Sequence, residues 1–239
     1  MPYIDGFLLA VPNARLDDYT AMAELGRTVW MEHGATAYME AVADDVPYGA
    51  VTSFPRAVMA KEDETVIFSY ILYPSKTVRD ACNKKVMEDE RMKGSMDDAP
   101  FDGKRMIFGG FETVVAPQQA SEPAGYVDGF VLPIETGELD RFRTLVQESA
   151  ALWTELGALS MGEAVADDAP VGELTSFPRS VQLKEGETVG FAFLTYRSRA
   201  HRDEVAARMT ADKRSEMMQN LPVDRKRMFF GGFRPIVQA

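Results

Sequence analysis

The sequence YIDGF at residues 3–7 returns as YVDGF at residues 126–130, an offset of 123 residues. Further matches lie along both halves, and a one-residue deletion near residue 99 changes the offset to 122. They include ADD at 43–45 and 166–168, TSFPR at 52–56 and 175–179, and FGGF at 108–111 and 230–233. Roughly two aligned positions in five are identical, which indicates a tandem duplication.

The two copies are separated by a segment of different composition. Residues 116–125 are rich in Pro, Ser and Gln and show no hydrophobic period, which is typical of a linker. We therefore divide the chain into a first repeat at 1–115, a linker at 116–125 and a second repeat at 126–239.

Each repeat has the pattern strand, helix, strand, strand, helix, strand. In the first repeat, apolar periodicity and turn residues predict two helices and four strands. Asn13 is expected to cap the first helix, Gly34 to end it, and Ser75 to cap the second. The expected elements are strands at 3–11, 37–45, 64–73 and 105–115, helices at 13–33 and 75–88, and a short helical stretch at 89–96. The glycine pair at 109–110, inside the last strand, indicates a bulge or a close backbone approach.

This order predicts a ferredoxin-like βαββαβ repeat whose two helices cover one face of an antiparallel sheet. The other face would be a large exposed apolar patch in a single repeat. We expect the second repeat to cover it. The fold class is therefore α+β, with two sheets packed into one intramolecular α/β barrel, a pseudo-dimer within one chain.

Composition limits the partners. The net charge of the 239-residue chain is −11 and acidic residues outnumber basic ones in both halves, which disfavours nucleic acid. No apolar run is long enough for a membrane span, and the first residues lack the pattern of a secretion signal. With Cys82 as the only cysteine, the expected location is the cytoplasm.

The loop motifs resemble the YbaA-like family of bacterial proteins. The resemblance rests on YIDGF, on WMEHGA at 30–35, on ADDVPYG followed by TSFPR, and on FDGKRM at 101–106. It covers both repeats and implies a dimeric α+β barrel, here as a fused homodimer. It implies no reaction, because the family has no established one.

Strand alternation groups the candidate site residues. Tyr3, Asp5 and Phe7 share one face of the first strand, and Glu40 lies on a face of the second strand with Tyr38 and Val42. The second repeat conserves the first of these faces, so we assign both to the barrel interior. Ala41 and Ala43 would then pack against helices.

Four carboxylates would point inward on this assignment. They are Asp5, Glu40, Asp128 and Glu163. In a poorly hydrated cavity, such groups can act as general bases, or bind metal if they converge. The alternative is that they form ion pairs with Arg56, Lys104, Arg105 and their equivalents, and this alternative is favoured.

The candidate ligand-binding residues come from the strands and from the loops. Tyr3, Phe7, Phe68, Tyr70 and Phe108 would line an apolar cavity between the sheets. Ser53 and Arg56, with Arg179 in the second repeat, offer polar contacts, and Lys104 and Arg105 are a further basic pair. Alternatively, Arg56 holds Asp44 or Asp45 within its own loop.

Histidine chemistry is restricted. His33 is a candidate catalytic base, but Leu156 occupies the matching position, which favours a packing role. With two histidines and one cysteine, a Cys/His zinc site is excluded, and no cofactor or metal is expected. No nucleotide-binding glycine loop or Ser/His/Asp arrangement is present.

The sequence therefore predicts a protein that binds a small apolar or aromatic molecule between its two sheets. Two alternatives stay open. One is an enzyme of the kind found on this fold, such as a cofactor-free monooxygenase or an isomerase, and the other is a structural or interaction role. The full chain is expected to be a monomer or a weak homodimer, because the fusion already covers the sheet face.

Overall fold

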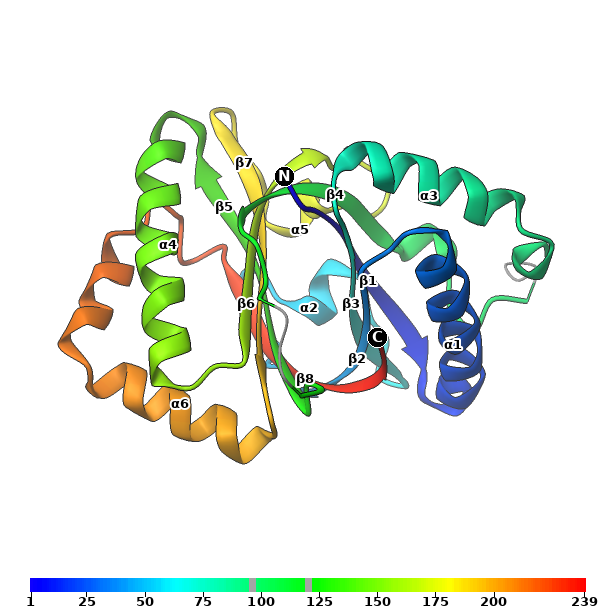
Figure 1. The fold of residues 1–239 in the computed structure, drawn as a ribbon, viewed down its shortest axis with the longest axis horizontal. Coiled ribbons are helices and arrows are strands. Elements are labelled where there is room, and N and C mark those ends of the chain that lie inside the picture. Colours follow the sequence, from blue (N-terminus) through cyan, green and yellow to red (C-terminus); the bar gives the residue numbers. More distant parts are fainter. Residues whose placement is uncertain (95–97, 119–121) are drawn as a thin grey trace.

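Each repeat forms a four-stranded antiparallel sheet with two long helices on one face (Figure 1). The computed structural model describes residues 1–94, 98–118 and 122–239. The first repeat contains β1 (Tyr3–Pro12), α1 (Leu16–His33), β2 (Ala37–Asp45), α2 (Phe54–Ala57), β3 (Glu64–Tyr73), α3 (Lys76–Glu88) and β4 (Ile107–Val115). The second contains β5 (Tyr126–Glu135), α4 (Leu139–Leu156), β6 (Ser160–Asp168), α5 (Phe177–Ser180), β7 (Glu187–Tyr196), α6 (Arg199–Ala211) and β8 (Phe229–Gln238). Short 3-10 turns are η1 (Asn13–Arg15), η2 (Glu90–Met92), η3 (Gly103–Arg105), η4 (Thr136–Glu138) and η5 (Lys213–Asn220).

Local sequence signals explain most of these boundaries. Gly34 ends α1 with a φ of 123°, which a glycine adopts without strain. Ser75 caps α3 by accepting a hydrogen bond from the backbone N–H of Val78 at 3.3 Å. The expected cap at Asn13 is wrong. Asn13 is the first residue of the turn η1, which has no side-chain cap, and the Asn13 backbone N–H donates to the carbonyl of Asp63 at 2.8 Å.

Two other boundaries differ from expectation. The last strand of the first repeat begins at Ile107, because η3 occupies the preceding residues. The helical stretch expected at 89–96 is the single turn η2, and residues 95–97 lie outside the described residues.

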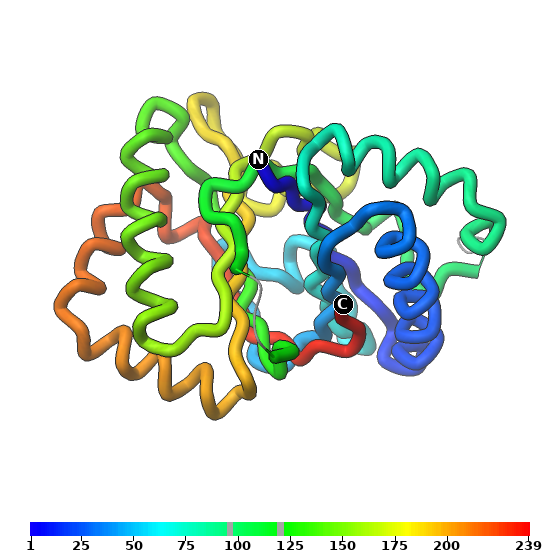
Figure 2. The backbone as a smooth tube through the Cα atoms, viewed as in Figure 1, coloured from blue at the N-terminus to red at the C-terminus, as the bar shows by residue number. Residues whose placement is uncertain are grey.

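The two sheets close into one barrel, as the sequence predicts. The strand order is β1-β3-β2-β8-β5-β7-β6-β4, so β2 pairs with β8 and β4 pairs with β6 across the repeats. The register of β4 on β6 shifts between Gly110 and Phe111, which confirms the bulge expected at the glycine pair. Figure 2 shows the C-terminus reaching back to the first repeat, where Tyr38 and Ala239 exchange two backbone hydrogen bonds.

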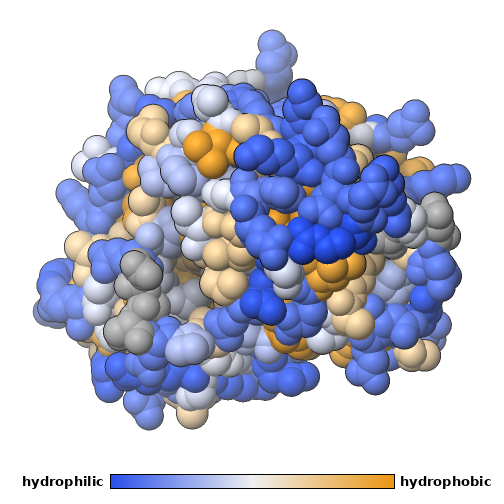
Figure 3. All heavy atoms as spheres, turned by 45° about the vertical axis from the view of Figure 1, so that its right-hand side comes forward, coloured by the Kyte–Doolittle hydropathy of each residue, from blue (hydrophilic) through white to orange (hydrophobic). Residues whose placement is uncertain are grey.

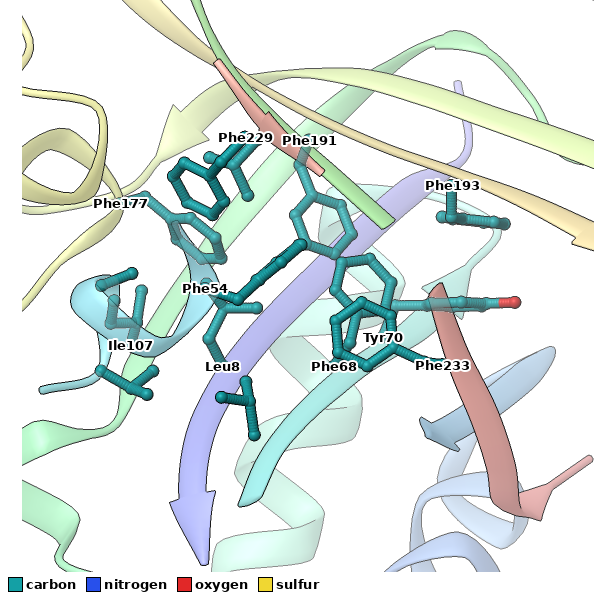
Figure 4. Close-up of a cluster of buried hydrophobic side chains, with 14 of the residues drawn as sticks. Leu8, Phe54, Phe68, Tyr70, Ile107, Phe177, Phe191, Phe193, Phe229 and Phe233 are labelled. Atoms are coloured by element: carbon teal, nitrogen blue, oxygen red, sulfur yellow. The ribbon is translucent and has the colours of Figure 1, made fainter. Parts of the chain in front are cut away.

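Aromatic side chains fill the barrel interior (Figure 4). Phe68 stacks on Phe191 with centroids 5.0 Å apart, and Tyr70 stacks on Phe193 at 3.9 Å, so each pair joins the two repeats. Phe54 of α2 packs edge-on against Phe68 from inside the barrel. The sequence did not predict this short helix or its counterpart α5. The space between the sheets is therefore a packed aromatic core where the sequence predicts a cavity.

The face assignment of β1 and β2 is reversed, whereas Phe68 and Tyr70 of β3 lie in the interior as expected. Ile4, Leu8 and Ala41 belong to the interior cluster, whereas Tyr3, Leu9 and Tyr38 pack beneath the helices. Glycines explain the interior face. A Cβ on Gly6 would lie 2.9 Å from the Phe191 ring, and one on Gly129 would lie 2.6 Å from the Phe68 ring. Each glycine gives room for a phenylalanine of the other repeat.

The helices cover opposite outer sides of the barrel, with α1 and α3 on one side and α4 and α6 on the other (Figure 1). The face shown in Figure 3 is largely hydrophilic, with small separate apolar patches. Within the described ranges, none of the helices combines the length and the apolar character that crossing a membrane requires.

Candidate functional site

Two cavities lie between sheet and helices, one in each repeat. The cavity of the first repeat has a volume of about 430 Å³. It is lined by Phe7, Leu9, Tyr19, Met22, Ala23, Trp30, Tyr38, Glu40, Ser69, Ile71, Val86, Met87, Met92, Phe101 and Met106. The cavity of the second repeat measures about 170 Å³. It is lined by Phe130, Leu132, Val146, Ser149, Trp153, Met161, Glu163, Ala192, Phe193, Leu194, Met218, Leu221, Val223, Arg225 and Met228.

Glu40 is the ionisable group of the first cavity. Its Oε2 accepts a hydrogen bond from the Tyr19 hydroxyl at 2.6 Å, and its Oε1 accepts one from Tyr38 at 2.9 Å. Burial raises the pKa of Glu40 to about 7, and hydrogen bonds from Tyr19, Tyr38 and Ser69 limit that rise. The carboxyl group therefore changes its charge near neutral pH.

Glu163 is the equivalent group of the second cavity, and its surroundings differ. It is 4% exposed, and its Oε1 has no hydrogen-bond partner among the described residues. Burial raises the pKa of Glu163 well above the ordinary value of 4.5. Burial therefore favours the neutral, protonated form of this carboxyl group.

The hydroxyl donors of the first cavity are missing from the second. Phe142 stands where the first repeat has Tyr19, and Met161 where it has Tyr38. Ala192 replaces Ser69. The second repeat thus keeps the carboxyl group and loses all three hydroxyls that stabilise its charged form.

Asp5 lies beside the first cavity and is paired with an arginine. Its carboxylate accepts hydrogen bonds from Arg79 at 2.7 Å and from Asn83 at 3.0 Å. Burial raises the pKa of Asp5, and Arg79 opposes that rise. The Asn83 side chain also accepts from Trp30 at 3.0 Å, which fixes one wall of the cavity.

The corresponding network of the second repeat is looser. Asp128 lies 3.7 Å from Arg202, and Ala206 replaces the asparagine. Burial raises the pKa of Asp128 to about 6, with Arg202 opposing. Both aspartates are therefore paired with arginines, which is the kind of role favoured from the sequence, but neither partner is one of those named there.

The ADD motifs connect the repeats. Tyr3 donates a hydrogen bond to Asp167 at 2.9 Å, and Tyr126 donates one to Asp44 at 3.0 Å. Lys76 also binds Asp167, and Arg202 pairs with Asp45 at 2.6 Å. The motif of each repeat thus holds the second helix of the other repeat. The expected clamp of Arg56 on Asp44 or Asp45 is wrong.

The predicted aromatic lining is divided between four environments. Phe7 lines the first cavity, whereas Phe68 and Tyr70 lie in the barrel core. Tyr3 is buried beneath α3, and Phe108 is 52% exposed. These residues do not form one site, because Tyr3 and Phe7 of β1 face the helices whereas Phe68 and Tyr70 of β3 face the barrel interior.

The loop residues have structural contacts. Ser53 caps α2 by accepting from the backbone N–H of Arg56 at 3.3 Å. Arg56 donates to the carbonyl of Gly49 at 2.7 Å, and Arg179 donates to that of Gly172 at 2.6 Å. These contacts maintain the loops that lead into α2 and α5.

The basic pair of η3 is likewise separate from the cavities. Arg105 is buried and forms a two-pronged ion pair with Glu64 at 2.7 and 2.8 Å. Lys104 is exposed. Neither lines a cavity.

His33 is partly exposed and lies outside the core. Its Nε2 is 2.9 Å from the carboxylate of Asp89, which also binds Arg91. The expected packing role is therefore wrong, and a side-chain contact with Asp89 at the end of α1 takes its place.

Tyr19 and Trp30 are cavity residues that the sequence reasoning left among the packing positions of α1. The signal was the exchange of Tyr19 for Phe142 at aligned positions, because a hydroxyl retained in one repeat marks a polar partner there. Within residues 1–94, 98–118 and 122–239, no three His, Cys, Asp or Glu side chains come together as a metal site.

Solved structures define the class. The chain is similar over its whole length to a "putative monooxygenase" from Lactobacillus acidophilus, with a TM-score of 0.65 at 11% identity and 95% of that chain covered. A second similar structure, an "anthrone oxidase-like protein", has a TM-score of 0.54 at 9% identity and covers all of this chain and 92% of the other. The closed barrel of two α+β units is thus a dimeric α+β barrel.

Sequence comparison defines the family within that class. The chain belongs to the family described as "Protein of unknown function (DUF1428)", whose model matches residues 2–103 and again 125–225. Uncharacterized protein YbaA of Escherichia coli K12 is 52% identical over 115 residues, which are 48% of this chain and 98% of YbaA. The same protein from Shigella flexneri matches equally well. The resemblance to YbaA-like proteins is confirmed.

Proposed function

We propose that the chain binds a small, largely apolar ring compound with one hydrogen-bond donor, in the cavity between the first sheet and its helices. The observation that carries this proposal is Glu40, a buried carboxyl group in the wall of an otherwise apolar cavity of about 430 Å³. Ligand sites of this kind are mainly apolar, with few polar groups that orient the ligand.

The hydrogen bonds of Glu40 leave room for such a donor. A carboxylate has about four lone-pair sites, and the hydroxyls of Tyr19, Tyr38 and Ser69 use three of them. A phenolic or similar hydroxyl of a ligand would complete the set. Four methionines, Met22, Met87, Met92 and Met106, give the walls an adaptable surface.

The test uses p-cresol and toluene, which differ by one hydroxyl. We expect p-cresol to raise the melting temperature more than toluene does, and to shift the indole N–H signal of Trp30 in an NMR spectrum. Ala23→Leu fills the first cavity and should abolish both effects. Val146→Leu, at the matching position of the second repeat, should preserve them. Binding that survives Ala23→Leu would contradict the proposal.

The enzyme alternative is a reaction in which Glu40 removes a proton from a bound substrate. A pKa of about 7 suits a general acid or base at neutral pH, and the two similar structures bear the names of a monooxygenase and an oxidase-like protein. Exchange of the α-protons of 2-tetralone in D2O, followed by NMR, tests it. Glu40→Gln should abolish any acceleration, whereas Glu163→Gln should retain it.

A further inference from the structure

The cavity of the second repeat contains the buried carboxyl group of Glu163. Oε1 of Glu163 has no hydrogen-bond partner among the described residues, although the residue is 4% exposed. A buried polar group without a partner is costly, and its presence at a cavity wall indicates a partner that comes from outside.

The neighbouring polar groups are already engaged. Ser149 directs its hydroxyl to the sulfur of Met218 at 3.4 Å. Arg225, at the exposed rim, donates to the backbone carbonyl of Met218. Neither forms a hydrogen bond or ion pair with Glu163 within the described part of the chain, so Oε1 of Glu163 is a buried lining atom without a partner there.

The protonation state decides what Glu163 can bind. Phe142, Met161 and Ala192 offer it no hydroxyl, so its charged form lacks the three donors that stabilise the charged form of Glu40. A protonated carboxyl group has one O–H, which donates a hydrogen bond. Glu40 accepts hydrogen bonds from three hydroxyls, whereas Glu163 in its protonated form is a hydrogen-bond donor.

We propose that the cavity of the second repeat is a separate site for a small neutral molecule whose polar group is a hydrogen-bond acceptor, such as a ketone carbonyl, which accepts from Glu163. The volume of about 170 Å³ suits one ring, since a cavity of about 150 Å³ accepts benzene. This site goes beyond the function proposed for the first repeat and does not depend on it.

The test compares cyclohexanone with methylenecyclohexane, which has nearly the same shape and no acceptor. Trp30 lines the first cavity and Trp153 the second, and they are the only tryptophans. Their indole N–H signals in a 15N-labelled sample, assigned with Trp30→Phe and Trp153→Phe, therefore report on the two cavities separately.

We expect cyclohexanone to shift the Trp153 signal and to bind there about 3- to 10-fold more tightly than methylenecyclohexane, the effect of one hydrogen bond. Glu163→Leu should remove this preference, and Glu163→Gln, which keeps a donor, should retain it. Equal affinity for the two probes, tighter binding of cyclohexylamine, or a preference that survives Glu163→Leu would overturn the proposal. A shift of Trp30 alone would also overturn it while leaving the first site intact.

Discussion

Each cavity has one buried glutamate in its wall, but the two carboxyl groups differ in the hydroxyl donors that surround them. In the first repeat, three hydroxyls hold the pKa of Glu40 at about 7 despite burial. In the second repeat, all three are replaced, and burial raises the pKa of Glu163 well above its ordinary value without hydroxyls that oppose the rise. The comparison teaches that the chemistry of a buried acid is decided by the residues opposite it, so conservation of the acid alone does not imply conservation of its role.

The largest effect is expected when the first repeat is separated from the second. We expect residues 1–117 alone to dimerise or aggregate, because the strand pairs β2–β8 and β4–β6 and the stacked aromatic core are lost. Light scattering at several concentrations measures this. The full chain, as a control, should be monomeric or weakly dimeric. A folded monomer of the isolated repeat would contradict the prediction.

The shared core should respond equally from either side. Phe68→Ala and Phe191→Ala each remove one ring of the same stacked pair, and each should lower the free energy of unfolding by about 3–5 kcal/mol. Urea unfolding measures the loss. A difference of more than about 1.5 kcal/mol between the two variants, roughly a factor of ten in the folding equilibrium, would show that the repeats do not contribute alike.

The titration of Glu40 should make stability depend on pH. Its folded pKa of about 7 lies above the value of 4.5, so the native state binds more protons and stability falls as pH rises between these values. The expected loss attributable to Glu40 is about 3 kcal/mol. Urea unfolding from pH 4.5 to 8 tests it, with Glu40→Gln as the comparison. Equal pH dependence in wild type and variant would contradict the assignment.

Leucine at the two glutamates should have effects of opposite sign. Glu163→Leu removes an unpaired buried acid and should stabilise the protein by about 1–3 kcal/mol. Glu40→Leu leaves buried hydroxyls of Tyr19 and Tyr38 without an acceptor and should destabilise it by a similar amount. Thermal unfolding compares them directly, and the same sign in both would refute the distinction between the cavities.

Removing a hydroxyl from one cavity, or adding one to the other, should make the pKa values of Glu40 and Glu163 more alike. Tyr19→Phe removes a donor from Glu40 and should raise its pKa, whereas Phe142→Tyr adds one near Glu163 and should lower its pKa. Carboxyl 13C signals followed through a pH titration measure both. Unchanged values in both variants would show that these hydroxyls do not set the charge.

The element order and the closed barrel could be predicted because the same helix and strand patterns occur in both repeats of the sequence. Local signals were sufficient for the helix ends at Gly34 and Ser75 and for the strands at 37–45 and 64–73. Each depends only on neighbouring residues in the sequence. The side of the sheet was harder. Alternation groups Tyr3, Asp5 and Phe7 on one face, but both faces of this sheet are buried, so hydrophobicity cannot choose between them.

A usable signal for the correct face was present in Gly6 and Gly129. A glycine within an apolar strand marks the close approach of another side chain. Gly6 follows Asp5 directly, so it lies on the opposite face of the strand and marks that face as the interior one. The site could be predicted only in part. Glu40 and Phe7 were identified, but Tyr19 lies on a helix, and its distance to Glu40 depends on how that helix packs.

The covalent connection of the two repeats has an evolutionary consequence. A chain with a single repeat can close such a barrel only with an identical copy, so any mutation appears in both cavities at once. Here the contacts of Gly6 with Phe191 and of Gly129 with Phe68 bind the halves reciprocally, while the helix-covered cavities belong to one repeat each. The barrel must therefore stay symmetric at its centre, and each outer chamber is free to specialise.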